Sequence, residues 1–480
     1  MISEHLPEIF AALLTLLYIL GILAAIEALL TARTPQGAIA WCLFLIMFPI
    51  LGLPVYLIFG GRKFSGYVSA RRDDNLPLQR RVQEVVADLP QEIFAEIGAE
   101  ESDLAVFEKL AQMPFLAHNH SRLLINGEQT FSAIFDGIKK AQEYILVQFF
   151  IVKNDELGQR LKNELINKAR SGLKVYFLYD AVGSHALPSS YVKAMKKAGI
   201  FTSPFSGSSH GGGHIFRVNF RNHRKIVVID GHTAYAGGLN VGDEYMGKHG
   251  TLSPWRDTHV EVCGPAVLAM QLAFHEDWYW MTHEVLPLSA KPVFSESDSE
   301  RMLVIPSGPA DELETCSLLF TELIHRAKKR VWIVSPYFVP DDAVMSALQI
   351  AALRGADVRI MLPENPDHKL VYLASFSFLE ETLPVGIKVY RYTEGFLHQK
   401  VFLVDDSLAG VGTANLDNRS FRLNFELTLL YADKKITAEV EKMLLQDFAC
   451  CRELSMADIN QRPWWFVLAT KIARLFSPVL

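Results

Sequence analysis

The sequence has little cysteine, and its cysteines are not spaced for disulfide or metal chemistry. There are five in 480 residues, with no CxxC pair and no regular spacing. A disulfide framework or a structural zinc site is therefore not expected, and a reducing compartment is the simpler interpretation. The five are Cys42, Cys263, Cys316, Cys450 and Cys451.

The chain also lacks an excess of positive charge. Its formal net charge is −6, which argues against a nucleic-acid-binding protein. Charged residues make up 21% and hydrophobic residues 50%, a balance that excludes intrinsic disorder. The mean hydropathy of +0.16 is high for a chain of this length. The length itself favours two or three domains.

The apolar excess is concentrated at the N-terminus. No charged residue occurs from Ile9 to Ile26 or from Gly37 to Gly61. A helix rises about 1.5 Å per residue, so each run can cross a hydrocarbon core about 30 Å thick. The first eight residues contain no lysine or arginine, which disfavours a cleaved signal peptide. We therefore predict a transmembrane hairpin in residues 1–61, with helices at about 9–30 and 37–60.

Basic residues set the expected orientation of this hairpin. Arg33 is the single basic residue in the connecting segment Thr31–Gln36, whereas several basic residues follow the second apolar run. Positive charge favours the cytoplasmic side, so both ends are predicted inside, with the long C-terminal part in the cytoplasm. Residues 62–115 are predicted to be a juxtamembrane linker. The basic residues after the second run are Arg62, Lys63, Arg71 and Arg72.

The rest of the chain reads as two copies of one α/β unit, at 116–290 and 291–460. Apolar β-rich runs alternate with helical patterns. In the first copy the run at 144–150 is followed by a helical pattern, a basic-glycine turn and a strand at 173–177. The run at 331–338 and the strand at 358–361 repeat that order. A duplicated α/β domain is the prediction.

The two copies carry the same polar motif. Each has a histidine and a lysine two residues apart, an aspartate five residues after the lysine, and an asparagine ten residues after the aspartate. In the first copy these are His223, Lys225, Asp230 and Asn240, and in the second His398, Lys400, Asp405 and Asn415. Side chains two apart on an extended strand point to one face, so both pairs can line one cleft.

Two imidazoles, two ammonium groups and two amides suit chemistry on a phosphodiester. The lysines can neutralise charge on the phosphate oxygens, and the amides can donate hydrogen bonds. One histidine can attack phosphorus while the other protonates the leaving alkoxide. No carboxylate cluster suggests Mg²⁺, so neither metal nor cofactor is expected. Asp230 and Asp405 are either catalytic or structural, bracing the turn and the lysine.

These motifs resemble the duplicated HKD motif of the phospholipase D superfamily, over about residues 116 to 455. The resemblance implies two similar α/β/α domains that share one active site, preceded here by the two transmembrane helices. It implies a phosphohistidine on one of His223 and His398, with the other as acid and base; His223 is only marginally preferred as nucleophile. Lys225, Lys400, Asn240 and Asn415 would bind phosphate. Asp257 and Glu426 stand where the family has acids that orient each histidine.

The hairpin together with the Gly412–Ser420 string is more narrowly similar to the bacterial cardiolipin synthases. That resemblance implies transfer of a phosphatidyl group between two phosphatidylglycerol molecules, giving cardiolipin and glycerol, at the bacterial inner membrane. The expected partners are phosphatidylglycerol and membrane lipids, not nucleic acid. The alternatives are a phospholipase D-type hydrolase or a transphosphatidylase with other phospholipids. A membrane scaffold that only keeps the fold, and a nuclease, are further alternatives.

Two segments outside the motifs are also conspicuous. Residues 461–480 contain paired tryptophans, apolar residues and basic residues, which suit either an interfacial amphipathic helix or a helix packed on the protein. The segment is too short to span a membrane. The Gly/His-rich stretch Ser208–His214 fits neither a zinc motif nor a P-loop, and a flexible loop is the simpler interpretation.

Overall fold

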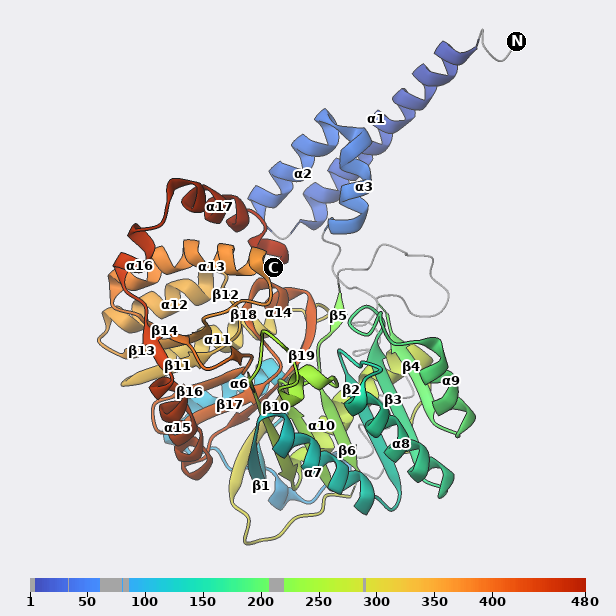
Figure 1. Ribbon diagram of the computed structural model, residues 1–480, viewed down its shortest axis with the longest axis vertical. Coiled ribbons are helices and arrows are strands. Elements are labelled where there is room, and N and C mark those ends of the chain that lie inside the picture. Colours follow the sequence, from blue (N-terminus) through green and yellow to red (C-terminus); the bar gives the residue numbers. More distant parts are fainter. Residues whose placement is uncertain (1–4, 33, 61–79, 81–85, 207–219, 288–290) are drawn as a thin grey trace.

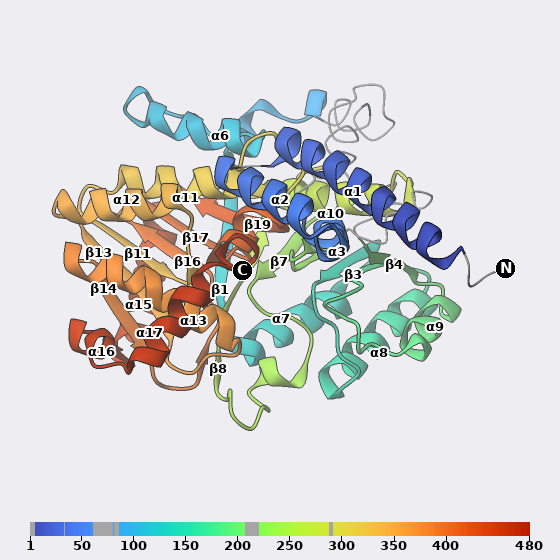
Figure 2. The same cartoon turned by 90° about the horizontal axis from the view of Figure 1, so that it is seen from above.

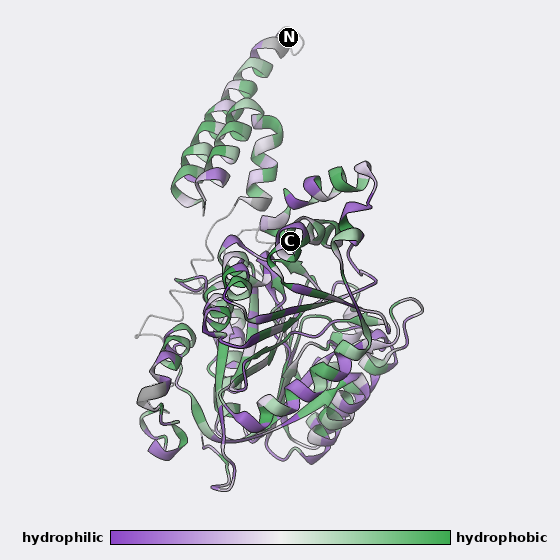
Figure 3. Ribbon diagram, turned by 90° about the vertical axis from the view of Figure 1, so that its left-hand side faces the viewer, coloured by the Kyte–Doolittle hydropathy of each residue, from purple (hydrophilic) through white to green (hydrophobic). Residues whose placement is uncertain are grey.

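The structure is a computed structural model that describes all residues except 1–4, 33, 61–79, 81–85, 207–219 and 288–290. The basic residues after the second apolar run, Arg62, Lys63, Arg71 and Arg72, therefore lie outside the described residues, as does Ser208–His214. The N-terminal helices stand apart from a large α/β body (Figure 1). Figure 3 shows these helices as the most continuously apolar part of the chain.

One of the two predicted membrane helices is present, and the other is not. Within the described residues, a single helix is long and apolar enough to cross a membrane, Glu8–Thr31 of α1 (Leu6–Thr31). The second apolar run breaks into α2 (Pro35–Met47) and α3 (Pro49–Phe59). The prediction of a second spanning helix at 37–60 is wrong because Pro49 disfavours helical backbone at Phe48, whose φ and ψ are −135° and 58°.

The two short helices form a hairpin that covers only part of α1. The bend between them packs at Gly21, near the middle of α1, where an added Cβ would lie 2.7 Å from the Leu45 carbonyl oxygen. Further along, the Cys42 thiol donates to the Ala25 carbonyl, and Tyr56 of α3 packs in the cluster with Ala25 and Leu45. Because α2 runs away from the body and α3 runs back toward it, the start of α2 and the end of α3 both lie near the C-terminal end of α1 (Figure 1).

The body is built on one continuous sheet with near two-fold symmetry in its strand order. The halves join where β1 pairs antiparallel with β10. From that seam the first half runs β1-β9-β7-β6-β2-β3-β4 and the second β10-β19-β17-β16-β11-β13-β14-β20. The first-half strands are β1 (Leu116–Ile125), β2 (Tyr144–Phe149), β3 (Lys174–Asp180), β4 (Phe201–Phe205), β6 (Ile226–Ile229), β7 (Thr233–Gly237) and β9 (Thr258–Cys263). The second-half strands are β10 (Glu300–Ser307), β11 (Arg330–Val334), β13 (Asp357–Pro363), β14 (Lys388–Tyr392), β16 (Val401–Val404), β17 (Leu408–Gly412), β19 (Asn424–Tyr431) and β20 (Cys451–Glu453).

The predicted strand–helix–strand repeat is confirmed. β2 and β3 pair in parallel across α8 (Glu156–Arg170), and β11 and β13 pair in parallel across α12 (Asp342–Leu353). Parallel neighbours need such a crossover helix. Figure 2 shows the two halves side by side.

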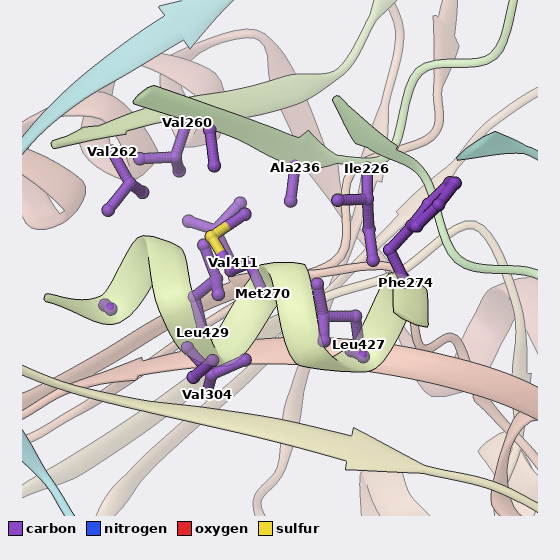
Figure 4. Close-up of a cluster of buried hydrophobic side chains, with 14 of the residues drawn as sticks. Ile226, Ala236, Val260, Val262, Met270, Phe274, Val304, Val411, Leu427 and Leu429 are labelled. Atoms are coloured by element: carbon purple, nitrogen blue, oxygen red, sulfur yellow. The ribbon is translucent and has the colours of Figure 1, made fainter. Parts of the chain in front are cut away.

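Helices cover both faces of each half. The outer helices are α7 (Asn126–Lys140), α8 and α9 (Ser189–Lys197) on the first half, and α11 (Thr315–Arg326), α12 and α13 (Lys369–Thr382) on the second. The inner helices α10 (Ala266–Thr282) and α15 (Lys434–Ala449) share one core with strands of both halves. In Figure 4, Met270 of α10 lies between Val260 of β9 and Leu429 of β19. Burial of α10 between the two halves therefore ties them together.

The end of the predicted linker belongs to the folded body. After η1 (Gln91–Ile93) and η2 (Ala99–Leu104), helix α6 (Ala105–Ala111) buries Phe107 against the second half. At the other terminus, α16 (Met456–Asn460), α17 (Trp464–Arg474) and η5 (Ser477–Val479) close the chain. α17 packs on α13 through Phe466 and Ala473.

Candidate active site

Both motif histidines follow a two-residue strand that pairs with the opposite half. β5 (Arg221–Asn222) precedes His223 and runs parallel to the start of β19. β15 (Phe396–Leu397) precedes His398 and runs parallel to β8 (Trp255–Arg256). The His223 amide donates to the Phe425 carbonyl at 2.9 Å, and the His398 amide donates to the Arg256 carbonyl at 2.8 Å. These matched pairings bring the two motifs to one site at the interface of the halves.

The pairing places each histidine beside a carboxylate of the other half. His223 Nδ1 lies 2.9 Å from a carboxylate oxygen of Glu426, and His398 Nδ1 lies 2.8 Å from Asp257. Both acids are fully buried. A carboxylate at Nδ1 fixes the ring and its tautomer, which leaves Nε2 as the reactive nitrogen. The structure thus places Asp257 and Glu426 beside the motif histidines. Each acid contacts the histidine of the other half, not that of its own.

Burial keeps both imidazoles neutral in the ligand-free protein. It lowers the pKa of His223 to about 4, against the opposing effect of Glu426. It also lowers the pKa of His398 to about 4, helped by the adjacent Lys400 ammonium. Burial alone would raise the pKa of Glu426, but His223 and Lys225 bring it below its usual value. Neutral imidazole is the form that can act as a nucleophile or a base.

The two lysines are buried cations beside the histidines. Lys225 Nζ donates to the His223 carbonyl at 2.6 Å, and Lys400 Nζ donates to the His398 carbonyl at 2.5 Å. Burial lowers the pKa of Lys225 well below its usual value, and that of Lys400 to about 8. Within the described residues, no carboxylate forms an ion pair with either ammonium. Buried positive charge without an ion-pair partner favours binding of an anion.

The two asparagines are positioned differently. Asn240 Oδ1 accepts from the Ile151 amide at 3.0 Å, and its Nδ2 donates to the Tyr245 hydroxyl at 3.1 Å. In contrast, Oδ1 of Asn415 is buried and has no hydrogen-bond partner in the part of the chain that the structure describes. Asn415 therefore retains the greater unused hydrogen-bonding capacity for a ligand.

Asp230 and Asp405 close turns far from the histidines. The Asp230 carboxylate accepts the amides of Gln142, Glu143 and Tyr144 at 2.8–2.9 Å. Asp405 accepts the amides that precede β11 at 2.8–3.0 Å. Each lies at the opposite end of its strand from the motif lysine, roughly 16 Å away at about 3.3 Å per residue. These contacts support the structural alternative for both aspartates and do not include the lysines.

The residue between each motif histidine and lysine anchors its strand to an inner helix. The sequence pattern did not predict this contact. Arg224 points away from His223 and binds Asp277 of α10 at 3.0 Å. At the equivalent position, Gln399 donates to Asp447 of α15 at 2.8 Å. Asp447 also binds Arg256 of the first half at 2.7 Å. A repeated signal was present, because Asp277 and Asp447 each precede an aromatic residue in the last inner helix of their half.

The geometry can perform displacement at phosphorus. Two Nδ1-anchored imidazoles present Nε2 to one site, where buried ammonium groups can neutralise phosphate oxygens. Within the described residues, no group of three or more His, Cys, Asp or Glu side chains is arranged to hold a metal ion.

Comparison with known proteins agrees with this chemistry. Residues 134–251 and 320–448 match the family model described as "Cardiolipin synthase, PLD-like domain", and 19–61 match "Phospholipase_D-nuclease N-terminal". "Cardiolipin synthase A" of Pseudomonas fluorescens is 48% identical over 476 residues, covering 99% of both chains. The protein of the same description from Pseudomonas putida is 49% identical over 482 residues, also covering 99% of both. The chain belongs to the cardiolipin synthase family.

Membership of the cardiolipin synthase family makes the chain a phosphatidyltransferase of the phospholipase D superfamily. Among solved structures, phosphatidylserine synthase from Haemophilus influenzae is similar with a TM-score of 0.58 and 18% identity. That similarity covers 79% of this chain and 100% of the other, and it shows the shared fold. The predicted α/β fold with two phospholipase D-like regions is therefore confirmed.

Proposed function

We propose that the chain transfers a phosphatidyl group from one phosphatidylglycerol to a second, giving cardiolipin and glycerol. The observation that carries the proposal is the pair of buried histidines, each anchored by a carboxylate of the other half, beside two lysines without ion-pair partners. Family membership supplies the substrate class.

The reaction has two balanced steps. Nε2 of one histidine attacks phosphorus of the first lipid and the bond to glycerol breaks, while the second histidine, as imidazolium, gives its proton to the departing glycerol oxygen. The second histidine, now neutral, removes a proton from a hydroxyl of the second lipid. That oxygen attacks phosphorus, the phosphorus–nitrogen bond breaks, and the imidazolium is regenerated. His223 and His398 fill these roles, with Lys225, Lys400 and the two asparagines binding the phosphate.

Ligand binding must supply the proton for the first step. Both histidines have a pKa of about 4 without ligand, so both are neutral near pH 7. A phosphodiester between them adds negative charge, which raises the pKa of the imidazole that becomes the acid. Proton uptake with substrate binding therefore prepares the general acid.

The chain acts at a membrane, with α1 as its one spanning helix and the body on the cytoplasmic face of the bacterial inner membrane. The length and apolar character of α1 support the span, and the basic residues after Gly60 support the orientation. α17 supplies a second membrane contact, because its residues Trp464, Trp465 and Leu468 are exposed and the helix lies on the side of the body nearest α1–α3 (Figure 1).

Purified full-length chain in phosphatidylglycerol vesicles tests the proposed reaction. Glycerol should appear in step with cardiolipin, and His223→Ala combined with His398→Ala should abolish both. Glycerol with phosphatidic acid in place of cardiolipin would make the chain a hydrolase. No product from a folded, reconstituted preparation would overturn the proposal in favour of a non-enzymatic role.

A further inference from the structure

Two arginines lie beside His223, outside the lysine pair. Arg221 occupies β5, two residues before His223, and Arg419 lies in α14 (Asn418–Arg422), four residues after Asn415. The backbone connects them closely, because the Arg221 amide donates to the Leu423 carbonyl at 3.4 Å and the Leu423 amide donates to the Arg419 carbonyl at 2.8 Å. Both positions therefore border the site on the same side.

Arg221 is a buried guanidinium with most of its donors unused. Only 9% of the residue is exposed, and the side-chain hydrogen bond that it makes among the described residues goes to the Phe220 carbonyl at 2.9 Å. Within the described chain it has no ion pair with a carboxylate. The Asp180 carboxylate, whose charge acts on it, already accepts the amides of Val182, Gly183 and Asn222.

Arg419 adds a second positive charge to the same place. Its side chain is partly exposed and donates to the Val479 carbonyl at 3.2 Å. Burial lowers the pKa of Arg221, and the charge of Arg419 lowers it further. The carboxylates of Asp417, Asp180 and Glu426 also act on the charge of Arg419. An anion bound between the two guanidinium groups adds charge-assisted hydrogen bonds to both.

The opposite side of the site has no such pair, although the backbone there is equivalent. Aligning the motif histidines puts Phe396 where Arg221 stands, since each is two residues before its histidine. Aligning the motif asparagines puts Glu244 where Arg419 stands, and Glu244 binds Lys153 at 2.5 Å. The two positions that carry arginine on one side of the near-symmetric centre therefore carry an aromatic residue and an acid on the other.

We propose that Arg221 and Arg419 bind the phosphate of the acceptor phospholipid, and so select an anionic acceptor over water or a neutral alcohol. The inference rests on the proposed function. Donor and acceptor are both anionic, and only a glycerol unit separates the attacking hydroxyl from the acceptor phosphate. That second phosphate must lie just outside the lysine-lined centre, where a guanidinium can bind it through two parallel hydrogen bonds.

The test compares two acceptors for one donor. Full-length chain in phosphatidylglycerol vesicles with added ethanol yields cardiolipin from the anionic acceptor and phosphatidylethanol from the neutral one. We expect Arg419→Gln and Arg221→Gln to lower the ratio of cardiolipin to phosphatidylethanol by ~10-fold or more, the usual effect of losing one charge-assisted hydrogen bond. Arg419→Lys, which keeps the charge, should restore part of the ratio.

Arg422→Gln is the matched control, because Arg422 lies in the same helix and its guanidinium binds the carboxylates of Glu314 at 3.0 Å and Asp341 at 3.3 Å. Its product ratio should equal that of the unmodified chain. If Arg221→Gln fails to fold, Arg419→Gln decides alone, since its side chain is partly exposed. An unchanged ratio in Arg419→Gln would overturn the inference. Phosphatidylethanol without cardiolipin from the unmodified chain would instead overturn the proposed function.

Discussion

The exchange of acids between the two halves gives each histidine a partner that its own half does not contain. Glu426 also accepts from the Thr413 hydroxyl at 2.5 Å and from Asn424 at 3.1 Å, so its carboxylate is held from several directions. Asp257 accepts the Thr258 amide at 2.8 Å. Neither acid can reorient freely, and the ring that each one anchors is therefore fixed before substrate arrives.

Neutralising these acids should impair catalysis through the histidines. We expect Glu426→Gln and Asp257→Asn each to lower the transfer rate on the order of 10²–10⁴-fold, because an amide holds the imidazole without stabilising imidazolium. The pKa of the general acid would fall, so the alkaline limb of its pH–rate profile moves to lower pH. Only one of the two variants should show that shift, and it identifies the acid.

Glu261→Gln is the control for these variants, since Glu261 of β9 binds Arg122 near the surface, away from the histidines. Its profile should match the unmodified chain. Near-normal rates in both acid variants would contradict the positioning roles of Glu426 and Asp257.

Acid should destabilise the folded chain through its buried imidazoles. Burial lowers the pKa of His223, His398 and His275 to about 4, and that of His259 to about 3. The unfolded chain takes up these protons near pH 6.5 and the folded chain does not. The contribution of these histidines to stability is therefore full above about pH 6.5 and falls as pH drops toward 4, by as much as ~3 kcal/mol per histidine.

Urea unfolding at several pH values measures this slope. His275→Gln removes one imidazole outside the site, so it should flatten the dependence between pH 6.5 and 4. A free energy of unfolding that stays constant over that range would contradict the neutral state of the buried histidines.

Among the N-terminal helices, α1 is long enough to cross a membrane, whereas α2 and α3 are each too short. The bend at Phe48 packs beside Gly21, so the hairpin reaches only about half the length of α1. A single span by α1 would place its N-terminal end and the α/β body on opposite sides of the membrane. The predicted hairpin with both ends inside would require α2 and α3 to be one straight helix.

Labelling distinguishes these topologies. In a chain whose native cysteines are replaced by serine, we expect His5→Cys to react with a membrane-impermeant maleimide added to intact cells. Glu92→Cys, on the body side, should react only after lysis. Protection of both positions in intact cells would show a second span.

α17 should hold the body against lipid. Its buried residues, Phe466, Thr470 and Ala473, pack on the protein, while Trp465 and Leu468 on the other side are 57% and 52% exposed. We expect Trp465→Ser with Leu468→Gln to slow transfer in vesicles several-fold but to leave transfer in mixed detergent micelles near normal.

Leu445→Gln is the matched control, because Leu445 is 47% exposed on α15, a helix that lies farther from α1–α3 than α17 does (Figure 1). Equal losses in vesicles and micelles for the α17 variant would mean that α17 only stabilises the fold.

At the scale of the whole molecule, the duplicated chain builds one centre from two half-sites. The repeat predicted the strand–helix–strand units because the hydrophobic and turn patterns that form them are local in sequence. The motif spacing likewise predicted that the histidines and lysines of the two copies line one site. The crossed pairing could not be read locally, since it depends on β5 meeting β19 across more than two hundred residues of sequence separation.

The error in the N-terminal helices has a local cause that was visible. Pro49 lies within the second apolar run, and the backbone before it leaves the helical conformation, whereas Pro54 lies inside α3 without ending it. The prediction of one straight helix rested on the length and hydropathy of the run. For Asp230 and Asp405 the regular motif spacing was an ambiguous signal. Their spacing in the motif is regular because the turn they close is part of the repeated fold, so spacing alone could not separate a structural role from a catalytic one.

Trapping the covalent intermediate tests the phosphohistidine mechanism. Phosphatidylglycerol labelled in its phosphate is mixed with the full-length chain, the reaction is quenched at alkaline pH within the first turnover, and the peptides are analysed by mass spectrometry. We expect labelled phosphate on one histidine, His223 or His398, and its loss when that residue is replaced by alanine. Cardiolipin formation with no label on either histidine would rule out a phosphohistidine intermediate.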